Sequence, residues 1–167
     1  LYTMSLVNTC RMAMGKDVDI ELVNTRCDAL VQKSRNYFVS MAIKHDVDDL
    51  IFIDDDIQWE PKWVFDLLNF PVDVVSGIYR KKYDHSEDYP FMPIVNSNGQ
   101  WYPPPVDTQT GLIEIACAPT GFLRLSKQAL QALWNSSEPY KNGIDGEDRA
   151  VFDLKIIDGT MYSEDYV

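Results

Sequence analysis

The sequence predicts an α/β fold: a central, mostly parallel mixed sheet flanked by helices, with a small antiparallel hairpin. Three observations support this prediction. Strand-like and helix-like segments alternate through the first half, residues 50–53 form an apolar run before three aspartates, and an Asn98-Gly99 pair separates two apolar runs in the second half. With 167 residues, the chain is long enough for one core, so we expect residues 1–167 to form a single domain.

The first half supplies the alternating elements. Apolar residues gather on one stripe of residues 26–45, the clearest helix, and Pro61 fits the first position of another helix. The other expected elements are a loose helix over 1–14 and strands over 19–25, 50–53 and 73–79. This strand–helix–strand–helix–strand order favours parallel strands joined by crossover helices.

The second half has a more antiparallel character. The Asn98-Gly99 pair predicts a hairpin over residues 92–102, because this dipeptide suits a tight turn. Ser126 is expected to cap a short helix over 127–134. The remaining expected elements are a loop over 102–111, strand-like runs over 112–118 and 119–126, a polar loop over 135–150 and a last strand over 152–158.

The composition excludes several classes of protein. The chain carries 15 Lys and Arg against 26 Asp and Glu, a net charge of −11, so we expect no nucleic-acid partner. No apolar run approaches the roughly 18 residues of a membrane span, and residues 1–6 do not resemble a signal peptide, which predicts a cytoplasmic protein. Cys10, Cys27 and Cys117 lack a CxxC spacing, which argues against a disulfide framework and a structural zinc site.

Three consecutive aspartates, Asp54, Asp55 and Asp56, follow the buried strand predicted over 50–53. Ligands of open α/β sheets bind outside the carboxyl ends of the strands. If these residues alternate as strand residues do, Asp54 and Asp56 face one side and Asp55 points away. Two carboxylates on one side suit Mg²⁺ or Mn²⁺, shared with substrate phosphates. The alternative interpretation is an acidic, solvated turn between a strand and a helix.

Two further patterns suggest a site. Gly121 lies inside a strand-like run, which marks either the close approach of a ligand or a simple bulge. Glu164 and Asp165 follow a β-like segment, where an acid can supply a general base. The same pair also suits the start of a helix capped by Ser163.

Taken together, these pieces resemble the GT-A fold glycosyltransferases, in particular the family-two-like group found in bacteria, phages and large viruses. The resemblance covers about residue 20 to the end, in matching order and spacing. A single Asp-x-Asp pattern is weak, whereas the ordered series is more specific. The matching segments are LVQKSRNYFVSMAI, LIFIDDDIQWEP, DVVSGIYRKK, PTGFLRLSKQAL and SEDYV.

The resemblance implies a GT-A (nucleotide-diphospho-sugar transferase) fold, with residues 1–80 as the nucleotide-binding half and 81–167 as the sugar and acceptor half. It implies transfer of a sugar from a nucleoside-diphosphate-sugar donor to an acceptor hydroxyl on a glycan, a lipid or a protein. Asp56 would ligate Mn²⁺ or Mg²⁺ that bridges the donor diphosphate, and Asp54 would hold the ribose or assist the metal. Asp55 belongs to the same cofactor-binding turn.

The resemblance assigns the other site residues as well. Arg35 and Asn36 would lie near the nucleotide or brace the aspartates, and Gly121 would leave room for the transferred sugar. Asp165, paired with Glu164, matches the base of inverting members. Lys82, in the run from Arg80, could approach the donor or the acceptor, although a solvated basic turn is an equal alternative.

The sequence departs from the family pattern at its ends, where a first strand before Leu1 and a segment after Val167 are expected, so we expect a chain truncated at both ends. His45 and His85 are expected to be exposed side chains rather than metal ligands. Trp59 is the better candidate for lining the sugar site. Trp101 and Tyr102 are more readily explained as a cover for the core.

Two alternatives remain open. One is a non-catalytic module that binds nucleotide sugars on the same fold. The other is a phosphatase of the haloacid dehalogenase type, which also has an Asp-x-Asp after a buried strand. That pattern calls for Thr or Val at the position of Gln58, and no matching downstream Lys and Asp-Asp set follows.

Overall fold

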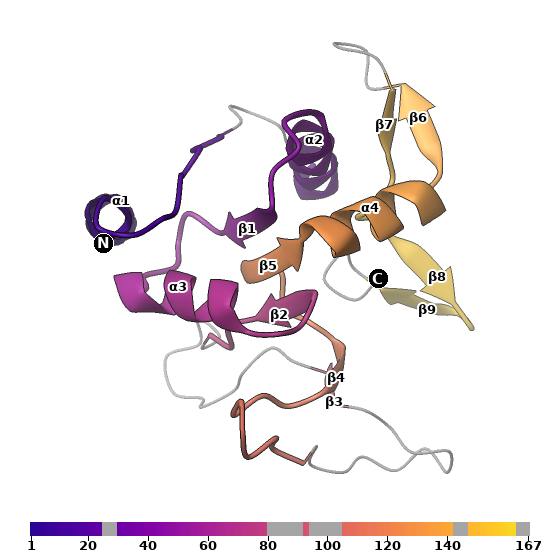
Figure 1. The fold of residues 1–167 in the computed structure, drawn as a ribbon. Helices are drawn as coiled ribbons and strands as arrows, with labels where there is room; N and C mark the ends of the chain where they lie inside the picture. Colours follow the sequence, from indigo (N-terminus) through magenta and orange to yellow (C-terminus); the bar gives the residue numbers. More distant parts are fainter. Residues whose placement is uncertain (25–29, 80–91, 94–104, 142–146, 163–167) are drawn as a thin grey trace.

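The computed structural model describes residues 1–24, 30–79, 92–93, 105–141 and 147–162 (Figure 1). These ranges contain helices and short strands. In chain order they are α1 (Tyr2–Ala13), α2 (Val31–Lys44), β1 (Asp49–Ile53), α3 (Pro61–Asn69), β2 (Val74–Ser76), β3 (Met92–Pro93), β4 (Ile115–Cys117), β5 (Phe122–Ser126), α4 (Lys127–Ser136), β6 (Pro139–Lys141), β7 (Glu147–Arg149), β8 (Lys155–Ile157) and β9 (Thr160–Tyr162).

The largest sheet in the described ranges has the strand order β1-β5-β2. β5 lies in the centre and pairs antiparallel with both neighbours, so a mostly parallel sheet is not seen there. β1 and β2 run in the same direction on either side of β5, and α3 connects them. The sequence pattern predicted these two strands correctly, but a pattern of apolar residues does not specify which strand pairs with which.

Helices cover both faces of this sheet. On one face, a cluster that includes Phe52 and Leu123 packs against α2 and α4. On the other face, Phe122 and Val75 pack with side chains of α1 and α3. Alternation of side chains along β5 explains how neighbouring residues serve the two cores, and four of its five residues are buried. The described core is therefore a three-layer arrangement of helix, sheet and helix.

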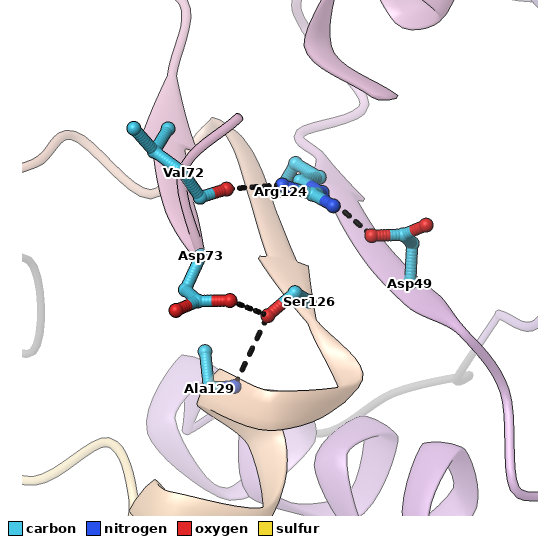
Figure 2. A network of polar contacts seen from close by, with 6 residues as sticks. All are labelled: Asp49, Val72, Asp73, Arg124, Ser126 and Ala129. Atoms are coloured by element: carbon cyan, nitrogen blue, oxygen red, sulfur yellow. Dashed lines mark hydrogen bonds and ion pairs between the residues drawn. The ribbon is translucent and has the colours of Figure 1, made fainter. Parts of the chain in front are cut away.

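Arg124, on the central strand, connects the three strands through its side chain (Figure 2). Its Nε donates to Asp49 Oδ1 of β1 at 2.6 Å, and its Nη1 donates to the carbonyl oxygen of Val72, just before β2. The guanidinium is almost fully buried, so both partners offset the cost of removing its charge from water. Arg124 therefore stabilises the order in which the strands pair.

Ser126 ends β5 and caps α4, as the sequence predicts (Figure 2). Its Oγ accepts a hydrogen bond from the backbone N–H of Ala129 at 3.1 Å and donates to Asp73 Oδ1 at 2.6 Å. The cap satisfies one of the free N–H groups at the start of the helix. The contact with Asp73 also joins the start of α4 to the segment that leads into β2.

Two expected elements differ from the structure, and a third stays a prediction. Residues 19–24 form no strand. Met92–Pro93 pair with β4, and the hairpin expected across Asn98-Gly99 is not tested, because residues 94–104 lie outside the described ranges. The polar loop expected over 135–150 contains the paired strands β6 and β7. β6 and β7 are strands because they pair with each other, and local composition carries little information about such a partner.

The last predicted strand forms one arm of a hairpin. β8 pairs with β9 across a turn at Asp158 and Gly159, both of which have positive φ values (50° and 79°). Two left-handed residues match a tight hairpin turn, which Asp-Gly favours. No helix within the described ranges is long and apolar enough to cross a membrane. Cys10 and Cys117, the cysteines within the described ranges, are free thiols.

Candidate functional site

The three aspartates form a turn rather than an extension of the strand. β1 ends at Ile53, and the backbone N–H of Ile57 donates to the carbonyl oxygen of Asp54 at 3.1 Å. The expected alternation of Asp54 and Asp56 is therefore wrong, because the chain turns at Asp55 and Asp56 and the strand does not reach Asp56. Asp55 and Asp56 are exposed at the tip, whereas Asp54 is partly covered.

The charges of Asp55 and Asp54 both reach one neighbour, the phenol of Tyr2. Burial and the negative charges of Asp55 and Asp54 raise the pKa of the Tyr2 phenol above its usual value. The ring of Tyr2 packs edge-on against that of Trp59, with centroids 5.1 Å apart. The start of α1 therefore lies beside the acidic turn.

Arg35 lies beside the first aspartate, as the resemblance implied for a residue that braces the turn. Its Nη2 is 3.4 Å from Asp54 Oδ1, and the Arg35 side chain is 7 % exposed against 42 % for Asp54. α2 carries Arg35, whose guanidinium also stacks over the Phe152 ring at 5.9 Å. A buried cation at this position lowers the electrostatic cost of gathering carboxylates at the end of β1.

Asn36, the neighbour of Arg35, does not face the aspartates. Its Nδ2 donates to the carbonyl oxygen of Phe152 at 3.0 Å, and its Oδ1 accepts from the backbone N–H of Phe152 at 2.7 Å. Successive helical residues are about 100° apart around the axis, which explains why these two side chains serve different neighbours. Asn36 thus joins α2 to the segment after β7, and its expected place near a nucleotide stays a prediction.

Gly121 lies directly against the acidic turn. The backbone N–H of Asp54 donates to the Gly121 carbonyl oxygen at 2.9 Å. A Cβ built on Gly121 would lie 2.6 Å from the Tyr79 hydroxyl and 2.9 Å from Asp54 Oδ2. The expected open space for a sugar at this atom is therefore taken by two side chains of the protein. A side chain at position 121 would require the ends of the Tyr79 and Asp54 side chains to move.

Trp59 is a core residue rather than a wall of the site. It is 3 % exposed, and its indole N–H donates to Thr9 Oγ1 of α1 at 2.9 Å. Its backbone N–H donates to Ser5 Oγ at 3.2 Å, and its ring packs near Phe122. The prediction that Trp59 lines a sugar site is thus wrong, because α1 turns its small polar residues Ser5 and Thr9 inward and satisfies the indole.

Several predicted site residues lie outside the described ranges and remain predictions. His45 is described: it is exposed and pairs with Glu21 Oε2 at 3.0 Å, consistent with the expected surface role. The residues outside the described ranges are Arg80, Lys81, Lys82, His85, Trp101, Tyr102, Glu164 and Asp165.

The acidic turn fits a divalent cation only as part of a shared site. Across the described ranges, no group of three or more His, Cys, Asp or Glu side chains is placed to hold a metal ion. Mg²⁺ usually takes one or two protein carboxylates and completes its shell with water and substrate phosphates. Asp55 and Asp56, which are exposed, together with the partly exposed Asp54 offer the hard oxygen ligands that such a shared site needs.

Two residues of the site were missed from the sequence. Tyr2 contacts the site through α1, whose contact with α3 no local pattern reveals. Tyr79 follows β2, and its hydroxyl accepts a hydrogen bond from the Gly121 N–H at 3.3 Å. The sequence offered one indication that Tyr79 belongs to the site: it lies at a predicted strand end, and ligands of α/β sheets bind at such ends.

No protein-family model, no curated protein and no solved structure matches this chain.

Proposed function

We propose that the protein is a metal-dependent glycosyltransferase, which moves a sugar from a nucleoside-diphosphate-sugar donor to an acceptor hydroxyl on a glycan, a lipid or a protein. One observation carries the proposal: Asp54 at the end of β1 is bonded through its backbone to Gly121 and through its side chain to Arg35. The GT-A resemblance named these three residues from three separate segments. Their assembly around one carboxylate supports a common site.

The proposed roles follow from charge and exposure. Asp55 and Asp56 project from the turn and, with Asp54, would hold Mn²⁺ or Mg²⁺ together with the donor diphosphate. When bound, the cation offsets the charge that develops on the departing nucleoside diphosphate. Arg35 keeps the carboxylate of Asp54 directed along one side of the turn.

The acid–base step belongs to a residue outside the described ranges. Asp165 would accept the proton of the acceptor hydroxyl as that oxygen attacks the anomeric carbon of the donor sugar. The bond between this carbon and the diphosphate oxygen breaks in the same reaction, and the nucleoside diphosphate leaves. Glu164 directly precedes this base in the sequence, and its negative charge would influence the pKa of the base.

Calorimetric titration with UDP-, GDP- and dTDP-sugars, with and without Mn²⁺, tests the proposal. We expect one donor to bind in a metal-dependent manner, and Asp56→Ala to abolish that binding without lowering the thermal midpoint. Asp19→Ala, which removes an exposed carboxylate away from the turn, serves as the matched control. Binding of no donor in the presence of metal would reject the transferase, and binding without transfer to any acceptor would favour a nucleotide-sugar-binding module.

A further inference from the structure

Tyr79 connects the end of β2 to the turn before β5. It lies three residues beyond Ser76, the last residue of β2, and its partly buried ring packs against the core cluster that contains Trp59 and Phe122. Its hydroxyl oxygen accepts the hydrogen bond from the backbone N–H of Gly121. The ring is thus held by packing, and the hydroxyl is held by a backbone donor.

The same hydroxyl shares a small space with the first aspartate. The position that a Cβ of Gly121 would occupy is 2.6 Å from the Tyr79 oxygen and 2.9 Å from Asp54 Oδ2. The other oxygen of Asp54, Oδ1, lies beside the Arg35 guanidinium. The Asp54 carboxylate therefore has a cation beside one oxygen, and its other oxygen and the Tyr79 hydroxyl both border the space beside Gly121 where a side chain would begin.

We propose that Tyr79 is a positioning residue of the candidate metal and diphosphate site, and that its hydroxyl helps to fix the direction of the Asp54 carboxylate. This inference rests on the proposed function. It also gives Gly121 a different purpose from the one that the resemblance implies. Gly121 lacks a side chain so that Tyr79 and Asp54 can approach its backbone, not so that a sugar can.

The physical reason is the freedom of a partly exposed carboxylate. An aspartate at a strand end can adopt several rotamers. Its oxygens meet a ligand in a fixed direction only when neighbouring groups exclude all rotamers but one. Groups that hold a ligating carboxylate without touching the metal typically change metal affinity by roughly 10–100-fold when removed. Arg35 would hold the Asp54 carboxylate through its positive charge, and Tyr79 would hold it through a hydroxyl on a packed ring.

The first experiment measures, by electron paramagnetic resonance, the affinity for Mn²⁺ in the presence of UDP, GDP or dTDP, because phosphates complete the shell of a shared metal site. We expect Tyr79→Phe, which keeps the ring and removes only the hydroxyl, to weaken Mn²⁺ binding by roughly 10–100-fold. Gly121→Ala should produce a similar loss by forcing Tyr79 and Asp54 apart. The matched controls are Tyr37→Phe on α2 and Gly15→Ala, where a Cβ would meet only one atom at 3.9 Å. Both controls should bind Mn²⁺ like the wild type.

The second experiment needs no metal. Amide hydrogen exchange at Gly121 should be faster in Tyr79→Phe, because that N–H loses its acceptor, and should be unchanged in Tyr37→Phe. Unchanged exchange at Gly121 would overturn the inferred contact. Wild-type Mn²⁺ affinity in Tyr79→Phe, or an equal loss in the controls, would overturn the positioning role alone. Failure of the wild-type protein to bind Mn²⁺ with any of these nucleoside diphosphates would overturn both this role and the proposed function.

Discussion

The backbone N–H of Asp54 donates a 2.9 Å hydrogen bond to the carbonyl oxygen of Gly121. This bond continues the pairing of β1 with β5 by one residue, and it involves no side chain. The relative placement of the acidic turn and Gly121 is therefore independent of the residue type at position 54. Substitutions of the side chains around this bond should change the chemistry of the site more than the fold.

Asp165→Asn should separate transfer from donor binding. If Asp165 accepts the acceptor proton, its amide cannot do so, and the transfer rate should fall on the order of 10²–10⁴-fold. The calorimetric affinity for the donor should remain unchanged. Asp19→Asn provides the control for loss of a carboxylate on the surface. A wild-type transfer rate in Asp165→Asn would reject this residue as the base.

Arg124→Met should destabilise the fold by about 3 kcal/mol, because it leaves Asp49 without its buried partner and removes the donor to the Val72 carbonyl. Urea denaturation monitored by circular dichroism measures this loss. Lys62→Met breaks the exposed pair with Asp66 and should cost only about 0.3–0.5 kcal/mol. Equal effects of the two substitutions would show that Arg124 does not hold the strands together.

Thr9→Val should lower stability by about 1–3 kcal/mol, because the buried indole N–H of Trp59 loses its acceptor while the side-chain volume stays similar. Chemical denaturation provides the free energy of unfolding. Thr3→Val makes the same change on an exposed position of the same helix and controls for helix propensity. The indole contact is unimportant if the two variants unfold at the same denaturant concentration.

Tyr2 should make stability pH-dependent only in alkaline solution. Its raised pKa means that the folded state holds the phenol proton more tightly than the unfolded state. Below the usual value of 10.0 both states are protonated and this contribution is constant, whereas stability falls as the pH rises from 10.0 through the folded pKa.

Two variants test this explanation. Tyr2→Phe should remove the alkaline slope, and Asp55→Asn should lower the Tyr2 pKa, since it removes one of the two charges that raise it. Nuclear magnetic resonance of labelled tyrosine, assigned through Tyr2→Phe, follows the titration. An unshifted Tyr2 pKa in Asp55→Asn would contradict the placement of Asp55 near the phenol.

The sequence predicted elements whose cause is local. The apolar run at 50–53, Pro61 at the first position of α3 and the Ser126 cap each depend on residues within a few positions, and all three are present. The resemblance also placed Arg35 beside the acidic turn, and the ion pair with Asp54 is found.

The features that were missed depend on partners far along the chain. Ser5 and Thr9 of α1 accept the two N–H groups of Trp59, whereas Met12, an apolar residue of the same helix, is exposed. Gly121 reads the same in the sequence whether a sugar or Tyr79 approaches it. A glycine within a strand pattern indicates that some group approaches the backbone closely, but it does not indicate which group.

The central place of β5 has a consequence for how the chain acquires its structure during synthesis. Arg124 and Asp49 are 75 residues apart, and β1 and β2 have no strand between them until β5 emerges from the ribosome. Pairing over such separations makes folding slow and leaves strand edges exposed in the meantime. β1 and β2 are therefore synthesised before their shared partner β5. During this interval their unpaired edges make the nascent chain most vulnerable to aggregation.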